Sequence, residues 1–239
     1  MKAIILAAGK GERLRGILNN IPKPMVEING KPILEHNILL LKKYGITDIY
    51  INLHHQLDVI RKHFGNGEKY GVNIKYSYEE TLLGTAGAVR KIADDYWNRK
   101  ECFILLCGDN LYQYDLREII NFHGRKKGIA TIAVYEKDDV SQSGIVVLDK
   151  DNKILRFIEK PKPEEVESNL VNTGIYILEP DVLGYIPPGK TLDFGKDVFP
   201  ELIEKGEDIF GVMIKGKLIA IDTPELLKEA LRTTKTDNG

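Results

Sequence analysis

Two short segments near the N-terminus carry residues that could bind phosphate groups. The first, Ala8-Gly9-Lys10-Gly11-Glu12-Arg13-Leu14-Arg15, combines small residues with cations and follows an apolar run. Small residues let the backbone approach a phosphate closely, and the exposed N–H groups of such a loop bind anions. The second, Ile21-Pro22-Lys23-Pro24-Met25, fixes the backbone on both sides of one lysine. A lysine held in this way can aim a point charge at a phosphate.

These two segments do not match the common phosphate-binding motifs. A dinucleotide-binding loop needs a small residue three positions after Gly11, where Leu14 stands. A P-loop needs Gly-Lys-Ser/Thr after four intervening residues, and the sequence lacks it. A basic surface loop with a proline turn would explain either segment alone, whereas the pair favours a phosphate site.

A carboxylate stands at the end of another apolar run. In Cys107-Gly108-Asp109-Asn110 the aspartate follows an expected buried strand, where a carboxylate costs free energy unless it has a partner. A solvated aspartate in a strand-end turn is the simpler alternative. The string Phe157-Ile158-Glu159-Lys160-Pro161 also ends an expected strand, and an isolated Glu-Lys-Pro is equally explained by a solvated ion pair.

The pattern of apolar residues predicts the elements that position these side chains. Strands are expected at 2–7, 48–53, 72–78, 102–107, 129–136, 144–148, 154–158, 171–178 and 209–213, and helices at 32–44, 57–64, 84–96, 116–127 and 224–232. Apolar strands that alternate with amphipathic helices indicate a parallel sheet covered on both faces. We therefore expect the α/β class, a three-layer α/β/α sandwich with a Rossmann-like, mostly parallel sheet. Ligands should lie beyond the carboxyl ends of the strands, after residues 7, 78, 107 and 158.

Composition excludes several classes of partner. The chain has 239 residues and a net charge of −1, so attraction to nucleic acid is not expected. No apolar run approaches the ~20 residues that span a bilayer, and the N-terminal apolar run is too short for a signal peptide, so we expect a cytoplasmic protein. Cys102 and Cys107 match no redox or zinc motif and are expected to be buried structural thiols. None of the five histidines forms a convincing pair with a carboxylate in the sequence.

The residues from Ile4 to Glu35 (IILAAGKGERLRGILNNIPKPMVEINGKPILE) resemble the signature of the sugar-phosphate nucleotidylyltransferases, or nucleotide-sugar pyrophosphorylases. The family pattern is Leu-Ala-Ala-Gly-x-Gly-Thr-Arg-Leu, then Pro-Lys-Pro, then Gly-Lys-Pro. Glu12 stands where the family usually has threonine or serine. Muramic-acid phosphate uridylyltransferases share this Lys-Gly-Glu-Arg version.

The resemblance implies a nucleotide site in the N-terminal half. Arg13 would stabilise the β- and γ-phosphates that leave, and Lys23 would neutralise the α-phosphate under attack. Glu80-Thr81-Leu82-Leu83-Gly84-Thr85-Ala86-Gly87 is similar to the Leu-Gly-Thr-Ala-Gly segment of guanylyltransferases for mannose and heptose 1-phosphates, which favours GTP. Its helix start should offer free N–H groups. The residues expected at the nucleotide are Ala7, Gly9, Gly11, Arg13, Lys23, Glu80, Gly84, Thr85 and Gly108, with Arg13, Lys23 and Asp109 catalytic.

The resemblance also implies a sugar-phosphate site in the C-terminal half. Glu159 would bind sugar hydroxyls, and Lys160 would hold the phosphate of the sugar. Asn172 would contact the sugar, and Gly144 would lie close beneath it.

A magnesium ion is expected on Asp109 and on a second aspartate near the C-terminus. The family usually reads Trp-x-Asp-Ile-Gly-Thr-Pro-Glu there, whereas this chain reads Leu218-Ile219-Ala220-Ile221-Asp222-Thr223-Pro224-Glu225. The usual ligand position is thus Ala220. Residues two apart on a strand point the same way, so Asp222 is the expected second ligand; an N-cap for the last helix and a site of weakened metal affinity are the alternatives.

The resemblance implies an enzyme of one domain, residues 1–239, without the C-terminal β-helix of some relatives. It would transfer a nucleotidyl group from GTP to a mannose- or heptose-type sugar 1-phosphate, as a monomer or small homo-oligomer with no nucleic-acid or membrane partner. The alternatives are uridylyl, thymidylyl or cytidylyl transfer to another sugar 1-phosphate or a phosphocholine-like substrate, and a non-catalytic nucleotide-sugar sensor. An oxidoreductase is disfavoured by Leu14.

Overall fold

The structure, a computed structural model, describes residues 1–9, 11, 21–54, 57–97, 101–221, 223 and 225–228. The chain divides into two compact units. Unit 1 comprises Met1, Leu82–Leu105 and Asp115–Lys215, and unit 2 comprises Lys2–Thr81, Leu106–Tyr114 and Gly216–Gly239. Unit 2 contains the expected nucleotide residues except Gly84 and Thr85, which belong to unit 1 with the expected sugar-phosphate residues. Each unit is described by itself.

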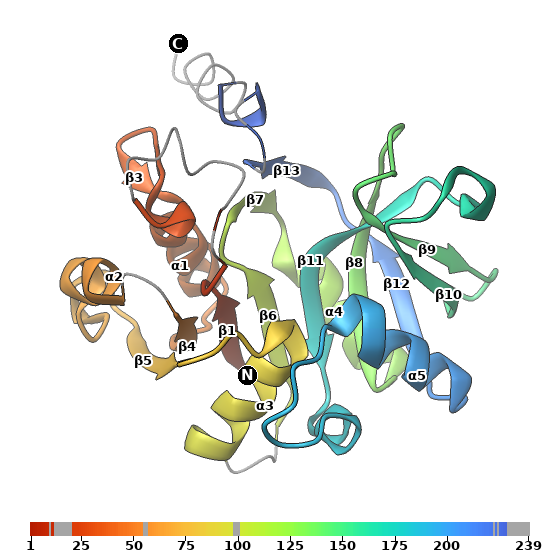
Figure 1. Cartoon of the computed structure of the whole chain (residues 1–239), viewed down its shortest axis with the longest axis horizontal. Coiled ribbons are helices and arrows are strands. Elements are labelled where there is room, and N and C mark those ends of the chain that lie inside the picture. Colours follow the sequence, from red (N-terminus) through yellow and green to blue (C-terminus); the bar gives the residue numbers. More distant parts are fainter. Residues whose placement is uncertain are drawn as a thin grey trace. The chain divides into compact units, whose positions relative to one another are not determined.

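Unit 2 is built on parallel strands (Figure 1). β1 (Lys2–Leu6) pairs with β4 (Asp48–Leu53), and β4 pairs with β5 (Asn73–Tyr78), all in parallel. The central residues of β1 are fully buried, as expected for a continuous apolar strand with both faces covered. Because the strands are parallel, their carboxyl ends meet at one edge of the sheet.

Two helices and a hairpin complete the N-terminal part of unit 2. α1 (Ile33–Lys43) buries the apolar face that the sequence predicted, and α2 (Leu57–Phe64) has the predicted bounds. β2 (Glu27–Ile28) and β3 (Lys31–Pro32) form a short antiparallel hairpin before α1.

An antiparallel pair in unit 2 was not predicted from the sequence. β7 (Asn110–Tyr114) pairs with β13 (Gly216–Ala220), and Ala220 lies opposite Asn110. The pair contributes to a buried apolar cluster that also includes the hairpin and the C-terminal segment. Its members are Val26, Ile28, Ile33, Leu111, Ile219, Ile221 and Leu227. This cluster connects the proline-flanked turn with the two strands that hold Asp109 and Ala220 near each other.

Unit 1 contains a mixed group of strands. β8 (Ala130–Glu136) pairs antiparallel with β11 (Leu170–Leu178) and parallel with β12 (Ile209–Met213). β9 (Gly144–Leu148) pairs antiparallel with β10 (Ile154–Glu159) and with β11. The fully buried residues of β8 and β11 form the centre of this group.

The helices of unit 1 are α3 (Gly84–Tyr96), α4 (Leu116–Lys126) and α5 (Phe199–Glu204). A single π-helical turn, Phe194–Val198, precedes α5. Single π turns are frequent at functional sites. The sequence analysis predicted α3 and α4 but neither α5 nor the π turn.

The remaining strand, β6 (Phe103–Cys107), is the predicted apolar strand, and Asp109 follows it. The expectation that the two cysteines are buried was wrong, since Cys102 and Cys107 are both only half-buried. Within the described ranges, no helix has the length and apolar character needed to cross a bilayer.

Candidate functional site

Lys23 and Asp109 lie together in unit 2. Lys23 Nζ is 2.6 Å from Asp109 Oδ2, in a salt bridge between residues far apart in the sequence. The Lys23 side chain is only 7% exposed, whereas 36% of the Asp109 side chain is exposed. The predicted cation and carboxylate therefore form one centre, which solvent reaches from the carboxylate side.

The prolines position Lys23 as the sequence suggested. Lys23–Met25 is a 3-10 turn in which Met25 N donates to Pro22 O over 2.8 Å. Pro22 is extended and Pro24 lies in the first turn, so the ring constraints fix the backbone on both sides of the lysine. A buried ammonium with a restricted backbone loses little entropy when it binds an anion.

Gly108 brings Asp109 to the end of the first strand. Its N–H donates to Leu6 O over 2.8 Å. A Cβ at position 108 would lie 2.8 Å from the same oxygen and 2.9 Å from Ile5 Cγ2, closer than real Cβ atoms come. Position 108 therefore requires glycine, which lets Asp109 lie directly at the carboxyl ends of β1 and β6.

A buried polar network that the sequence analysis missed holds the start of the first loop. Ala7 N donates to Asn52 Oδ1, and Asn52 Nδ2 donates to Glu79 Oε1, both over 2.7 Å. The network ties the carboxyl ends of β1, β4 and β5 together. Its signal in the sequence was an asparagine inside the apolar strand 48–53, which needs a partner when buried.

The first loop is described at Gly9 and Gly11. Gly11 has a φ of 57°, which favours glycine, and a Cβ there would lie 3.5 Å from Lys23 Cβ. Gly11 thus lies beside Lys23, as a phosphate loop requires. Arg13 lies outside the described residues, so its expected role stays a prediction. Glu80 is exposed just beyond β5.

The helix start at Gly84 differs from its expected form. Thr85 N donates to Asp193 Oδ1, and Ala86 N donates to Leu192 O. A Cβ on Gly84 would lie 2.4 Å from Leu192 O, so a glycine is needed for this backbone oxygen to approach the helix start. The expectation of free N–H groups was therefore wrong, although contacts of Gly84 and Thr85 with a nucleotide stay predictions.

In unit 1, the Glu159 carboxylate is enclosed by two glycines. Cβ atoms on Gly144 and Gly195 would lie 2.7 and 2.8 Å from Glu159 Oε2. The pKa of the Glu159 carboxyl is raised, mainly by burial. The charge of Asp193 raises this pKa further, and the charges of Lys160 and Lys196 offset part of the rise. Gly195 and Lys196, from the π turn, were not predicted because no familiar motif contains them.

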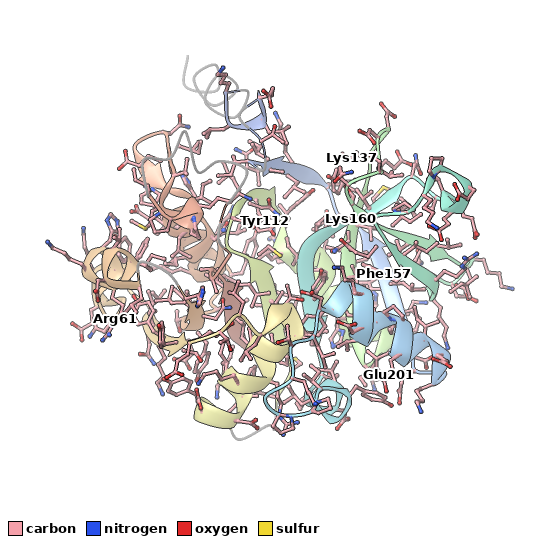
Figure 2. The ribbon with its side chains drawn as sticks, in the orientation of Figure 1. Arg61, Tyr112, Lys137, Phe157, Lys160 and Glu201 are labelled. Atoms are coloured by element: carbon pink, nitrogen blue, oxygen red, sulfur yellow. The ribbon has the colours of Figure 1, made fainter. Side chains whose placement is uncertain are left out.

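The residues around Glu159 are held by local contacts; Figure 2 labels Phe157 and Lys160 of this group. Lys160 has a φ of 51°, unusual for a residue with a side chain, and its N–H donates to Ser143 O over 3.1 Å. Asn172 accepts a hydrogen bond from Gly174 N and donates to Tyr176 Oη. The predicted sugar-binding residues Gly144, Glu159, Lys160 and Asn172 all lie in unit 1.

The half-buried Glu159 carboxyl leads to a prediction about stability. Because its folded pKa is raised, the folded chain holds the proton more tightly, so the free energy of unfolding falls as pH rises from the ordinary glutamate pKa to the raised value. Glu159→Gln has no carboxyl to titrate, so its free energy of unfolding should not fall in this way as pH rises. We expect the melting temperature of the variant, relative to wild type, to rise over that pH range and then level off. Thermal melts test this, with exposed Glu164→Gln as control; a constant difference would contradict it.

Comparison with known proteins decides the family. A family model described as nucleotidyl transferase matches residues 2–218. The chain belongs to the nucleotidyl transferase family. It is 42% identical over 223 residues to a UTP–glucose-1-phosphate uridylyltransferase of Synechocystis sp., covering 89% of this chain and 58% of the relative. It is 35% identical over 229 residues to the mannose-1-phosphate guanyltransferase of Saccharomyces cerevisiae, covering 94% and 62%. The chain thus spans about three fifths of the length of these curated relatives.

Solved structures share the fold of this nucleotidyl transferase. HddC from Yersinia pseudotuberculosis superposes with a TM-score of 0.81 at 28% identity, covering 97% of this chain and 98% of that one. A UDP-glucose pyrophosphorylase complexed with UDP-glucose superposes with a TM-score of 0.85 at 22% identity, covering 99% and 98%. The predicted fold class is confirmed: a mixed, mostly parallel central sheet flanked by helices.

The position at which the chain departs from the family pattern lies opposite Asn110, the residue that follows Asp109. Ala220 stands at the position of the usual metal ligand and pairs with Asn110 across β7 and β13. Its methyl group cannot bind a cation. The Asp109 side chain is 36% exposed, and carboxylate oxygens are the ligands that a hard cation such as Mg²⁺ prefers. Asp222, the expected second ligand, lies outside the described residues, and its role stays a prediction.

Proposed function

We propose that the chain transfers a nucleotidyl group from a nucleoside triphosphate to a sugar 1-phosphate, giving a nucleotide-sugar and pyrophosphate. The observation that carries this proposal is the 2.6 Å pair of Lys23 and Asp109, beside Gly11 of the glycine-rich loop. A buried cation, a phosphate loop and an accessible carboxylate at the carboxyl ends of parallel strands suit a triphosphate.

The reaction needs charge neutralisation more than proton transfer. A phosphate oxygen of the sugar 1-phosphate, anionic at neutral pH, forms a bond to the α-phosphorus while the bond from that phosphorus to pyrophosphate breaks. No general base is required. Lys23 would neutralise the α-phosphoryl group, and Arg13 is expected to stabilise the leaving pyrophosphate.

Asp109 would hold the magnesium ion, together with Asp222. Bound Mg²⁺ would supply positive charge at the phosphate oxygens. The ion pair of Lys23 with Asp109 keeps the two side chains together in the site. The chain itself contributes orientation: the 3-10 turn holds the lysine, and Gly108 holds the carboxylate.

The group around Glu159 supports binding of the second substrate in unit 1. The carboxylate can accept hydrogen bonds from sugar hydroxyls, and Gly144 and Gly195 leave the space that the carboxylate itself and the Phe157 ring occupy. Lys160 would pair with the phosphate of the sugar, and Lys196 is a second cation close to Glu159. Asn172 is expected to contact the sugar from β11.

GTP is our favoured nucleotide, with a mannose- or heptose-type sugar 1-phosphate. The Leu83-Gly84-Thr85-Ala86-Gly87 segment, the 35% identity to a mannose-1-phosphate guanyltransferase, and the solved complex of HddC with GMP-PN favour it. UTP with glucose 1-phosphate is the second candidate, because the uridylyltransferase of Synechocystis is 42% identical. A few contacts at the base and sugar decide between them.

Pyrophosphate release across a substrate panel tests the proposed function. The purified chain with Mg²⁺ is supplied with each common nucleoside triphosphate and with mannose, heptose and glucose 1-phosphates. We expect release only when both substrates are present, and at least about tenfold faster with GTP and mannose or heptose 1-phosphate, a difference of about 1.4 kcal/mol. Faster release with UTP and glucose 1-phosphate would establish the second candidate. Binding of nucleotide-sugar with no release for any pair would identify a sensor.

A further inference from the structure

Unit 1 contains three side chains of metal-ligand type that come together from separate elements. Cys102 precedes β6, His123 lies on α4, and Glu179 follows β11. One ligand atom of each lies within 4.8 Å of the others. We propose that Cys102, His123 and Glu179 bind one Zn²⁺ or a similar transition-metal ion, at a site separate in ligand chemistry from the magnesium carboxylate Asp109.

The distances suit a tetrahedral ion. Ligand bonds of about 2.0–2.3 Å at tetrahedral angles place ligand atoms about 3.3–3.6 Å apart. His123 Nε2 is 3.1 Å from Glu179 Oε1, and the thiol lies within the 4.8 Å limit of both. Small side-chain rotations are therefore sufficient to surround a cation, without movement of the elements.

The imidazole is already oriented for coordination. His123 is buried, and its Nδ1 lies 2.8 Å from the hydroxyl of fully buried Thr131. Without a cation, Nε2–H donates to the Glu179 carboxylate, and Nδ1 can accept from the Thr131 hydroxyl. On metal binding Nδ1–H would donate to Thr131 Oγ1, which leaves the lone pair of Nε2 directed at the cation position. Metal-bound histidines commonly have such a partner at the second ring nitrogen, which fixes the tautomer.

The same geometry disfavours a reactive cysteine. A thiol activated by a histidine needs the orienting carboxylate on the opposite ring nitrogen, but Thr131 holds Nδ1 and Glu179 contacts Nε2. A cation between the three groups would stabilise the Cys102 thiolate and the Glu179 carboxylate.

The ligand set indicates the metal and leaves room for water. Thiolate and imidazole select zinc and similar ions, whereas magnesium prefers oxygen ligands. Glu179 is 38% exposed and Cys102 is half-buried, so solvent can reach the fourth position. Three protein ligands and one water form a common zinc arrangement. Binding would join the start of β6, α4 and the end of β11, so it should stabilise unit 1.

Cobalt binding tests the proposal on the full chain. After chelator treatment, the protein is titrated with Co²⁺ in excess Mg²⁺, which fills oxygen sites such as Asp109. We expect a thiolate-to-cobalt charge-transfer band that saturates at one ion per chain and is displaced by Zn²⁺. Cys102→Ser should abolish the band, and Cys107→Ser, which changes the only other cysteine, should retain it. Thr131→Val should weaken binding about 10- to 100-fold.

Glu179→Gln provides a second variant should Cys102→Ser fail to fold, because Glu179 is partly exposed. It should also weaken Co²⁺ binding, and Zn²⁺ should raise the melting temperature of wild type more than that of either variant. The absence of the band in folded wild type would overturn the proposal. So would a band that persists in Cys102→Ser or disappears in Cys107→Ser. These readouts do not depend on nucleotidyl transfer.

Discussion

Replacing Lys23 with methionine is expected to lower the turnover of nucleotidyl transfer by about a hundred- to a thousandfold. The variant keeps the apolar stem but removes the cation that would neutralise the α-phosphoryl group. Its effect on folding should be about 1 kcal/mol or less, because the remaining Asp109 carboxylate is 36% exposed and solvent can stabilise it. Steady-state pyrophosphate release and denaturant unfolding measure the two effects.

Lys91 provides a matched control for Lys23. Its Nζ lies 2.6 Å from Asp95 Oδ2, the same separation as in the Lys23 pair, but the pair lies on the surface of α3. Lys91→Met should therefore leave turnover within about twofold of wild type. Near-normal turnover in Lys23→Met would remove this lysine from the catalytic residues. An equal loss in both variants would indicate a general effect of lost surface charge.

Asp109→Asn is expected to have the second large effect, on both turnover and stability. The amide is a weaker ligand for Mg²⁺, so turnover should fall by about two orders of magnitude or more. The change also removes the acidic partner of a lysine that is only 7% exposed, which should cost about 1–3 kcal/mol of unfolding free energy. Activity over a range of Mg²⁺ concentrations and urea unfolding check these results.

The double variant Lys23→Met/Asp109→Asn separates the two effects of Asp109→Asn. Removing both charges should recover most of the stability lost in Asp109→Asn, because no buried cation then faces an amide. Turnover should remain at the level of the single variants or below it. Recovery of turnover with stability would mean that the pair is structural and that nucleotidyl transfer occurs elsewhere in the chain.

The sequence predicted the elements and the site residues best where those residues lie close to the end of a strand or helix. The bounds of β4, α2 and α3 agree with those expected, because each combines a clear apolar period with a glycine or polar stop. Lys23 and Asp109 were predicted to meet because each follows a signal of its own, the two prolines and the end of an apolar strand. Their 2.6 Å contact is present in the structure.

Features that depend on distant pairing were not predictable in this way. β7 and β13 are short, and each obtains its partner about a hundred residues away along the chain. The contacts of residues 192–194 with the start of α3 are also long-range: Asp193 Oδ1 accepts from Thr85 N, and Leu192 O accepts from Ala86 N. The sequence therefore predicted open N–H groups where the structure has hydrogen-bonded ones. Cys102, His123 and Glu179 have no regular spacing, and only the fold brings them together.

A crystal structure with a non-hydrolysable nucleoside triphosphate and Mg²⁺ would test the proposed transfer centre most directly. We expect Lys23 Nζ within about 3 Å of an α-phosphate oxygen and Asp109 bound to the metal, with their present salt bridge broken or lengthened. A nucleotide bound away from an intact Lys23–Asp109 pair would contradict the proposal.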